Sequence, residues 1–242
     1  MFKNSILLRR RSDRSSPKHG QAAVFGAGKF RVVQPEILDR LPENSTAARA
    51  SRRDLLVINR LLGSSAWFKK ILRTRCLPSD QVLEVGAGTG ELGRTLTRIT
   101  PVLAGLDLGR RPPYWPVHAQ WFETDVFAFG RWADYSIVIG NLFFHHFDRG
   151  GLAQLGARLG EHARVVIASE PLRRHRTAML FPLICPLIQA HPVTRYDGRV
   201  SIAAGFRGEE LPLQLQLDPA VWSWQVKETL FGSSRMVAWR RV

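Results

Sequence analysis

The sequence predicts an α/β fold in which a doubly wound, mostly parallel sheet of seven strands is covered by helices. Three observations predict it. After residue 80, short apolar runs alternate with helical patterns. A glycine-rich segment, GAGTG, follows the first of these runs directly. The last 21 residues, 222–242, hold two strand-like runs joined by Gly232-Ser233-Ser234, which predicts an antiparallel hairpin at or near the sheet edge.

The expected strands are short and apolar, and turn residues or helical patterns separate them. Continuous apolar strands of this kind are typical of a parallel sheet covered on both faces. The five runs before the hairpin are residues 81–85, 102–106, 121–122, 135–139 and 164–168. Helical patterns occupy residues 91–99 and 152–159, between successive runs. The hairpin strands are residues 222–229 and 235–241, which completes the seven.

Two regions precede this sheet. Residues 1–32 contain eight Lys or Arg and one Asp, a net charge of +7, with little periodicity. We expect a disordered basic tail, although an organelle-targeting segment or a nucleic-acid-binding arm has the same composition. Residues 33–79 form an expected helical cap segment, broken at Gly63-Ser64-Ser65. The expected domains are therefore 1–32, 33–79 and 80–242.

Composition restricts the class of protein. The chain has 242 residues, 45% of them hydrophobic, which is enough for one large core. Its only cysteines, Cys76 and Cys185, have neither disulfide-framework nor zinc spacing, so we expect a reducing, cytoplasmic location and no metal. No secretory signal or transmembrane segment is expected: the apolar stretch 178–190 is too short, and two prolines should prevent one straight helix there.

The glycine segment has the spacing GxGxG, in Gly86-Ala87-Gly88-Thr89-Gly90. Glycines at the carboxyl end of a parallel strand let the backbone turn sharply and approach a ligand. A dinucleotide-binding loop needs a further glycine at position 91, where this chain has Glu91. A carboxylate there disfavours a pyrophosphate but not a cationic sulfonium, so the loop favours a sulfonium ligand.

Three acidic residues accompany this loop. Glu84 lies two residues before Gly86, Asp107 ends the next strand, and Asp125 follows the third. A carboxylate at the position of Asp107 can accept both ribose hydroxyls, and Asp125 can accept a hydrogen bond from an adenine amino group. The alternatives are a solvated loop residue for Asp107, a helix cap for Asp125 and a purely structural glycine loop.

These residues resemble the class I S-adenosylmethionine-dependent methyltransferases, whose pattern is hh(D/E)hGxGxG followed by an acidic second-strand end. The resemblance covers about residues 80–240 and implies a Rossmann-like fold. It also implies that S-adenosyl-L-methionine is held by Gly86, Ala87, Gly88, Gly90, Asp107, Asp125 and Asn141, with Glu84 orienting the loop or the amino-acid end. More narrowly, QPEILDR (34–40), NLFFHHF (141–147), SEP (169–171), VTRYD (193–197) and AGFRGEEL (204–211) resemble bacterial small-molecule methyltransferases found near polyketide-type biosynthesis genes.

The acceptor side is expected just past residue 140. Amino-directed DNA enzymes of this family have (D/N)PP(Y/F/W) here, whereas Leu142-Phe143 follows Asn141, which disfavours a base nitrogen as acceptor. His145 and His146 are candidate general bases for a hydroxyl acceptor, or else they cap the next helix or pack under the loop. Glu170 either lines the site or pairs with Arg173 or Arg174. Residues 178–198 are expected to cover the pocket, or to form an ordinary buried helix pair.

The expected function is transfer of a methyl group from S-adenosyl-L-methionine to a hydroxyl of a hydrophobic, apolar or aromatic small molecule. The alternatives are an RNA or protein methyltransferase, suggested by the net charge of +15, and a non-catalytic cofactor-binding scaffold. The region after residue 32 has no concentrated basic block interleaved with aromatics, so no specific nucleic acid is expected as a partner.

Overall fold

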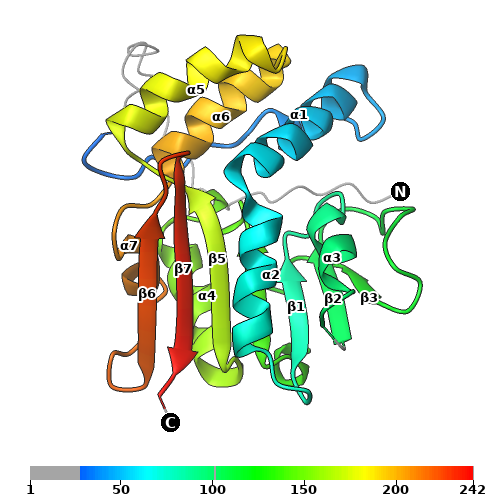
Figure 1. Ribbon diagram of the computed structural model, residues 1–242, viewed down its shortest axis with the longest axis vertical. Helices are drawn as coiled ribbons and strands as arrows, with labels where there is room; N and C mark the ends of the chain where they lie inside the picture. The colour runs from blue at the N-terminus through cyan, green and yellow to red at the C-terminus, as the bar shows by residue number, and fades with distance from the viewer. Residues whose placement is uncertain (1–27, 101, 242) are drawn as a thin grey trace, which may run out of the picture.

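The computed structural model describes residues 28–100 and 102–241. A single sheet runs through the molecule, helices cover its two faces, and a helical cap lies over its carboxyl edge (Figure 1). Most of the expected basic tail, residues 1–27, lies outside the described residues.

The sheet has seven strands in the order β3-β2-β1-β4-β5-β7-β6. Their bounds are β1 Gln81–Val85, β2 Val102–Asp107, β3 Gln120–Glu123, β4 Ile137–Asn141, β5 Val165–Pro171, β6 Trp222–Glu228 and β7 Ser233–Arg240. β1 to β5 pair in parallel, and β7 is antiparallel to both of its neighbours, β5 and β6. The predicted α/β class, mostly parallel sheet and C-terminal hairpin are therefore confirmed, with the antiparallel strand one position in from the edge.

Apolar side chains alternate between the two faces of the central strands, which is why helices are needed on both. Leu83 and Val138 belong to the core on the α4 side. Val82 and Ile137 belong to the core under α2 and α3. Both sets are fully buried, as expected for strands covered on two sides.

The helices before the hairpin follow the predicted pattern closely. α1 spans Thr46–Leu62, α2 Ser64–Arg75, α3 Glu91–Leu96, α4 Arg149–His162, α5 His175–Leu187, α6 Pro192–Ala204 and α7 Glu210–Gln214. Three short 3-10 helices, η1 Leu38–Arg40, η2 Trp132–Asp134 and η3 Phe144–His146, complete the list for the described residues. The predicted break between α1 and α2 is confirmed at Gly63, whose φ of 67° lies in the left-handed region.

The two prolines of the apolar stretch, which were expected to prevent one straight helix, do not end the helix. α5 is continuous although Pro182 and Pro186 lie inside it. Each proline removes one backbone donor, and the second lies in the last turn, so few hydrogen bonds are lost. Close packing on α6 supports the helix: the Phe181 ring fills the space beside Gly198, where a Cβ atom would lie 2.1 Å from it. No helix among residues 28–100 and 102–241 has the length and apolarity needed to cross a bilayer.

Residues 28–32 are attached to the domain. Arg173 donates hydrogen bonds to the carbonyls of Gly28 and Lys29, and the Val32 N–H donates to Ala203. The Arg31 guanidinium donates to the carbonyls of Ala204, His145 and Phe147 and to the Gln214 side chain. These five residues of the expected tail are therefore held by the domain, while the division into three regions stays a prediction.

Candidate active site

The glycine loop turns at the carboxyl end of β1 and is tied to β2. Gly86, Gly88 and Gly90 have φ values of 65°, 53° and 71°, a conformation that favours glycine at each position. The N–H groups of Gly86 and Ala87 both donate to the Leu106 carbonyl, at 2.9 and 3.2 Å. The loop is thus held open beside the end of β2, with Gly88 exposed.

Asp107 meets this loop directly. Its Oδ2 accepts a hydrogen bond from the Gly88 N–H at 2.8 Å, and its Oδ1 accepts one from Gly109 at 2.7 Å. The structure therefore brings Asp107 and the glycine loop together at one edge of the sheet. Asp107 fixes the loop even without a ligand, unlike a solvated loop residue.

Glu84 points toward α3 rather than into the open crevice. Its side chain is buried beside Gly93, where a Cβ atom would lie 2.7 Å from Oε2, and Oε2 has no hydrogen-bond partner among the described residues. Burial and the nearby Asp107 carboxylate raise the pKa of Glu84 to about 8, so this carboxyl is protonated at neutral pH. Its position suits orientation of the loop-to-α3 turn.

Asp125 and Asn141 lie on either side of the loop. Asp125 follows β3, and its Oδ1 accepts from the Phe127 N–H at 2.8 Å within a turn at residues 126–128, where no helix begins. Asn141 ends β4; its amide donates to the Asn59 side chain at 3.1 Å, and its buried Oδ1 has no partner within residues 28–100 and 102–241. Next to it, the Phe143 ring packs on Gly86, where a Cβ atom would lie 2.3 Å away.

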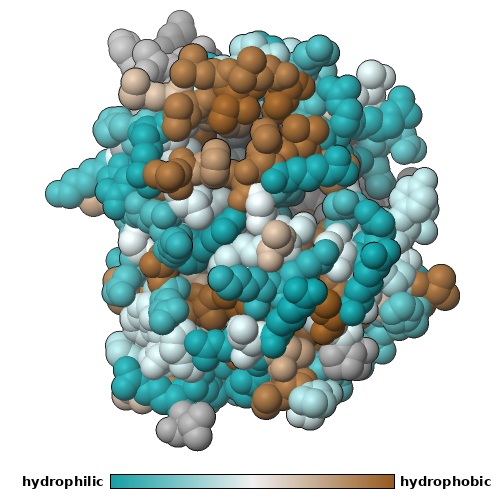
Figure 2. Space-filling model, viewed as in Figure 1, coloured by the Kyte–Doolittle hydropathy of each residue, from teal (hydrophilic) through white to brown (hydrophobic). Residues whose placement is uncertain are grey.

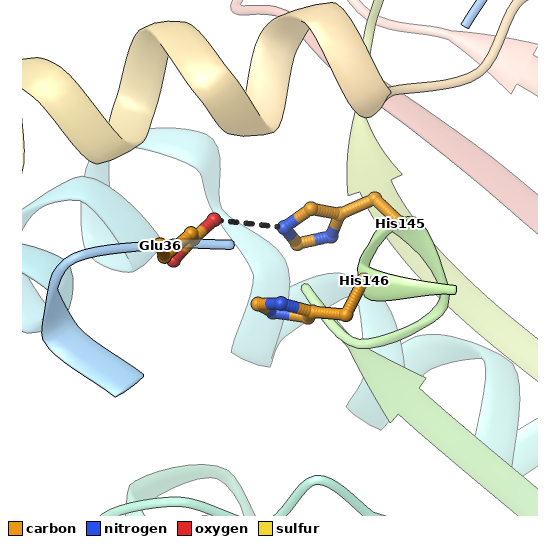
Figure 3. A group of neighbouring side chains, drawn as sticks. All are labelled: Glu36, His145 and His146. Atoms are coloured by element: carbon orange, nitrogen blue, oxygen red, sulfur yellow. Dashed lines mark hydrogen bonds and ion pairs between the residues drawn. The ribbon is translucent and has the colours of Figure 1, made fainter. Parts of the chain in front are cut away.

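The two histidines follow β4 and differ in their surroundings. The His145 ring is buried and bonds through Nδ1 to Glu170 at 2.8 Å. Its Nε2 faces the Glu36 carboxylate at 3.4 Å (Figure 3). The His146 side chain is 31% exposed, with Nδ1 at 3.8 Å from Asp39. His146 is therefore the histidine that an approaching acceptor can reach.

Glu170 holds the histidine segment in place. It is fully buried and accepts from the backbone N–H groups of Phe143 and Phe144 at 3.0 Å each, and from that of His145 at 3.2 Å. The alternative that Glu170 pairs with Arg173 or Arg174 is wrong, because Arg173 pairs with Glu210 and Arg174 with Glu228. Glu170 at the end of β5 thus fixes the turn after β4.

The two rings carry different charges at neutral pH. Burial alone lowers the pKa of His145, but hydrogen bonds to Glu170 and Glu36 outweigh it and raise this pKa to about 9. Burial and the neighbouring His145 cation lower the pKa of His146 to about 4. Burial opposes ionisation of Glu36, yet its hydrogen bond with His145 keeps its pKa at about 2. The result is an ion triad, Glu36–His145–Glu170, beside a neutral His146.

Residue 36 reaches this cluster because the cap holds its segment. Ser201 on α6 donates a hydrogen bond to Glu36, and the Asp197 carboxylate accepts from the N–H groups of Ile37 and Leu38 at 2.8 and 2.9 Å. Sequence reasoning did not single out Glu36, which is 109 residues before His145. The only signal was its place in the QPEILDR segment.

Within the described part of the chain, one group of three side chains lies close enough together to hold a metal ion. It consists of Glu36, His145 and His146. Their ligand atoms lie within 4.8 Å of one another. The two rings, however, stack with centroids 4.2 Å apart and only 35° between their planes. Nitrogen lone pairs lie in the ring plane, so both rings would have to rotate to bind one ion. The expected absence of a metal stays a prediction, and this geometry favours it.

The sheet order, the glycine loop and the acidic end of β2 together define the class I methyltransferase fold. Solved structures confirm the fold. The plantazolicin methyltransferase BpumL in complex with SAH matches with a TM-score of 0.66 and 11% identity, over 85% of this chain and 93% of that one. The plantazolicin methyltransferase BamL, in complex with a triazolic desmethylPZN analog and SAH, matches with a TM-score of 0.61 and 11% identity, over 84% and 92%.

The pyocyanin biosynthetic protein PhzM is a third similar structure, with a TM-score of 0.54 and 18% identity over 84% of this chain and 60% of that one. No protein-family model matches the chain. No curated protein matches it either.

Proposed function

We propose that the chain is an S-adenosyl-L-methionine-dependent methyltransferase whose acceptor is a hydroxyl of a hydrophobic small molecule. The observation that carries the proposal is the neutral His146 beside the ion triad, one strand away from the glycine loop. Because β1 and β4 are neighbours, the two groups lie at the same edge of the sheet. The solved structures similar to this chain that hold SAH support the choice of cofactor.

The residues at the loop fit this cofactor. Gly86, Gly88 and Gly90 offer backbone without side chains, and Asp107 offers a carboxylate beside them. The unpartnered Oδ1 of Asn141 is a free acceptor for a polar group such as an ammonium. Asp125 is our candidate for the adenine end, through its Oδ2, because its Oδ1 accepts from the Phe127 N–H. When bound, the cofactor supplies an electrophilic methyl carbon on a sulfonium.

The chain's own groups supply alignment and proton transfer. The acceptor oxygen would bond to the methyl carbon as the methyl–sulfur bond breaks, the demethylated thioether would leave, and a ring nitrogen of His146 would take the hydroxyl proton. Glu170 and Glu36 engage both ring nitrogens of His145, so this buried ring holds the turn that carries His146 rather than contacting the acceptor. Rings of Phe127, Phe143 and Phe147 pack together beside the histidine turn and make the surroundings apolar. This environment suits a hydrophobic acceptor.

The test separates this function from the two alternatives. Calorimetry on the full chain should detect S-adenosyl-L-methionine and its demethylated product but not NAD. Formation of the demethylated product is then followed with phenols, with RNA and with protein as acceptors. Turnover only with a phenol supports the proposal; turnover only with RNA or protein overturns the acceptor. Cofactor binding without any turnover indicates a scaffold, and NAD binding without cofactor binding would falsify the whole proposal.

A further inference from the structure

The cap carries an apolar surface that no other described element covers. Met179, Leu183 and Leu187 recur every four residues along α5, so they share one face of this helix. Their exposed fractions lie between 67% and 82%. Figure 2 shows hydrophobic residues gathered over this end of the molecule, where Figure 1 places α5. Such a stripe is unusual for a helix that faces only water.

The hairpin extends this surface. Leu230 and Phe231, in the turn between β6 and β7, are 77% and 72% exposed. The turn lies against the start of α5: Arg176 donates to the Thr229 carbonyl, and a Cβ atom at Gly232 would lie 2.7 Å from Thr177. Two elements distant in sequence therefore present large apolar side chains on neighbouring parts of the cap.

Basic residues border the apolar side chains. No Asp or Glu occurs between residues 172 and 196, and the exposed Arg174, Arg176 and Arg195 lie in this stretch. Arg174 and Arg176 share the single carboxylate of Glu228, at 2.8 and 3.8 Å, so one positive charge remains uncompensated between them. Exposed leucines with arginines around them are the composition of a surface that enters the interface of an anionic bilayer.

We propose that the α5 face, Met179, Leu180, Leu183 and Leu187, docks this protein on an anionic membrane surface, with Leu230 and Phe231 beside it. The charges decide against two other occupants. A symmetric dimer through this face would bring the arginines of two copies together. Residues 1–27 carry six Lys or Arg and one Asp, so they share the positive sign of the rim. An anionic lipid layer complements both the apolar face and its rim.

The α5 face lies near the proposed acceptor site, so docking would bring this site close to the membrane. The helix α6 packs beside α5. Its Ser201 and Asp197 bind the segment that contains Glu36. The docked cap would therefore lie between the bilayer and the histidine turn. A hydrophobic acceptor would then be concentrated in the lipid beside the cap that covers the proposed site.

Vesicle flotation with the full chain tests this inference. The protein should float with vesicles of phosphatidylcholine and phosphatidylglycerol and bind less to phosphatidylcholine alone. The double variant Leu183→Glu/Leu187→Glu should lower binding to the anionic vesicles about tenfold or more. The matched control is Leu77→Glu/Leu213→Glu, which adds the same charge at two exposed leucines, one before β1 and one on α7, and should bind like the wild type.

Three results would overturn the inference. The first is the absence of binding to anionic vesicles, and the second is equal binding by the two double variants. The third is a dimer, detected by analytical ultracentrifugation, that the Leu183→Glu/Leu187→Glu variant no longer forms and the control variant still forms. Equal binding would assign attachment to basic residues elsewhere, and the dimer would assign the face to a second copy. The flotation uses neither cofactor nor acceptor, so its result is independent of the proposed methyl transfer.

Discussion

The Asp107 carboxylate accepts a hydrogen bond from the backbone N–H of Gly88, at 2.8 Å, across the gap between β2 and the glycine loop. One side chain thus both shapes the loop and stands where ribose hydroxyls are expected. Asp107→Ala should weaken binding of S-adenosyl-L-methionine by about 1.5–3 kcal/mol, the scale of a hydrogen bond to a charged group. Calorimetry measures this change.

Asp107→Asn is the control for the loop contact, because its amide oxygen can still accept from one N–H group. It should bind the cofactor with intermediate affinity. Urea unfolding should show both variants folded, since the side chain is at a strand end. An unchanged dissociation constant for the alanine variant would remove Asp107 from the cofactor site.

His146→Ala should lower kcat by about 10²–10⁴-fold and leave cofactor affinity nearly unchanged, because it removes the proton acceptor and no cofactor contact. His146→Gln can keep a hydrogen bond but cannot accept the proton, so it should be as slow. Part of the lost rate should return at high pH when the acceptor is a phenol, which then ionises unaided. Near-normal kcat in both variants would refute the base assignment.

The pH profile distinguishes His146 from His145. A base works when deprotonated, so activity is lost as the pH falls through its pKa. With His146 as the base, at a pKa of about 4, kcat/KM should be flat from about pH 6 to about pH 8. With His145 as the base, at a pKa of about 9, it should rise about tenfold per pH unit over that range. A steep rise with a non-ionising acceptor would transfer the role to His145.

Glu84→Gln should change how stability depends on pH. The folded protein keeps the Glu84 proton up to about pH 8, whereas the unfolded chain loses it near the ordinary pKa of 4.5. The unfolded state therefore binds fewer protons between these values, and stability falls by about 1.4 kcal/mol per pH unit as the pH rises. Glutamine has no such proton, so urea unfolding at several pH values should show a shallower decline for the variant. Equal slopes would contradict a raised pKa for Glu84.

Two truncations test where the domain begins. A chain starting at residue 28 should unfold with nearly wild-type free energy. A chain starting at residue 33 should be less stable by about 1–3 kcal/mol, because loss of Arg31 leaves buried carbonyls without donors. Arg31→Ala in the longer chain is the matched control and should reproduce most of the loss. Equal stability of the two truncated chains would place the boundary back at residue 32.

The sheet and the glycine loop could be predicted from the sequence, because both depend on short-range patterns. Gly86, Gly88 and Gly90 need left-handed backbone, and Asp107 ends an apolar run, so each can be recognised within a few residues. Contacts between distant segments could not be predicted in this way. Glu36 reaches His145 through a segment with little regular structure, held by Asp197 of α6. The packing of Phe181 of α5 beside Gly198 of α6 is another contact that short-range patterns do not reveal.

The strand order also separates the proposed cofactor residues from the proposed acceptor residues. The proposed cofactor residues up to Asp125 belong to β1, β2, β3 and the turns that follow them, whereas the histidine turn follows β4 and its carboxylate partner Glu170 lies at the end of β5. The cap helix α6 contacts η1, η3 and β5, and α1 reaches the proposed cofactor residue Asn141 through Asn59. We therefore expect acceptor choice to change when α5 and α6 are replaced and Asn59 is retained, while the turns after β1, β2 and β3 stay as they are.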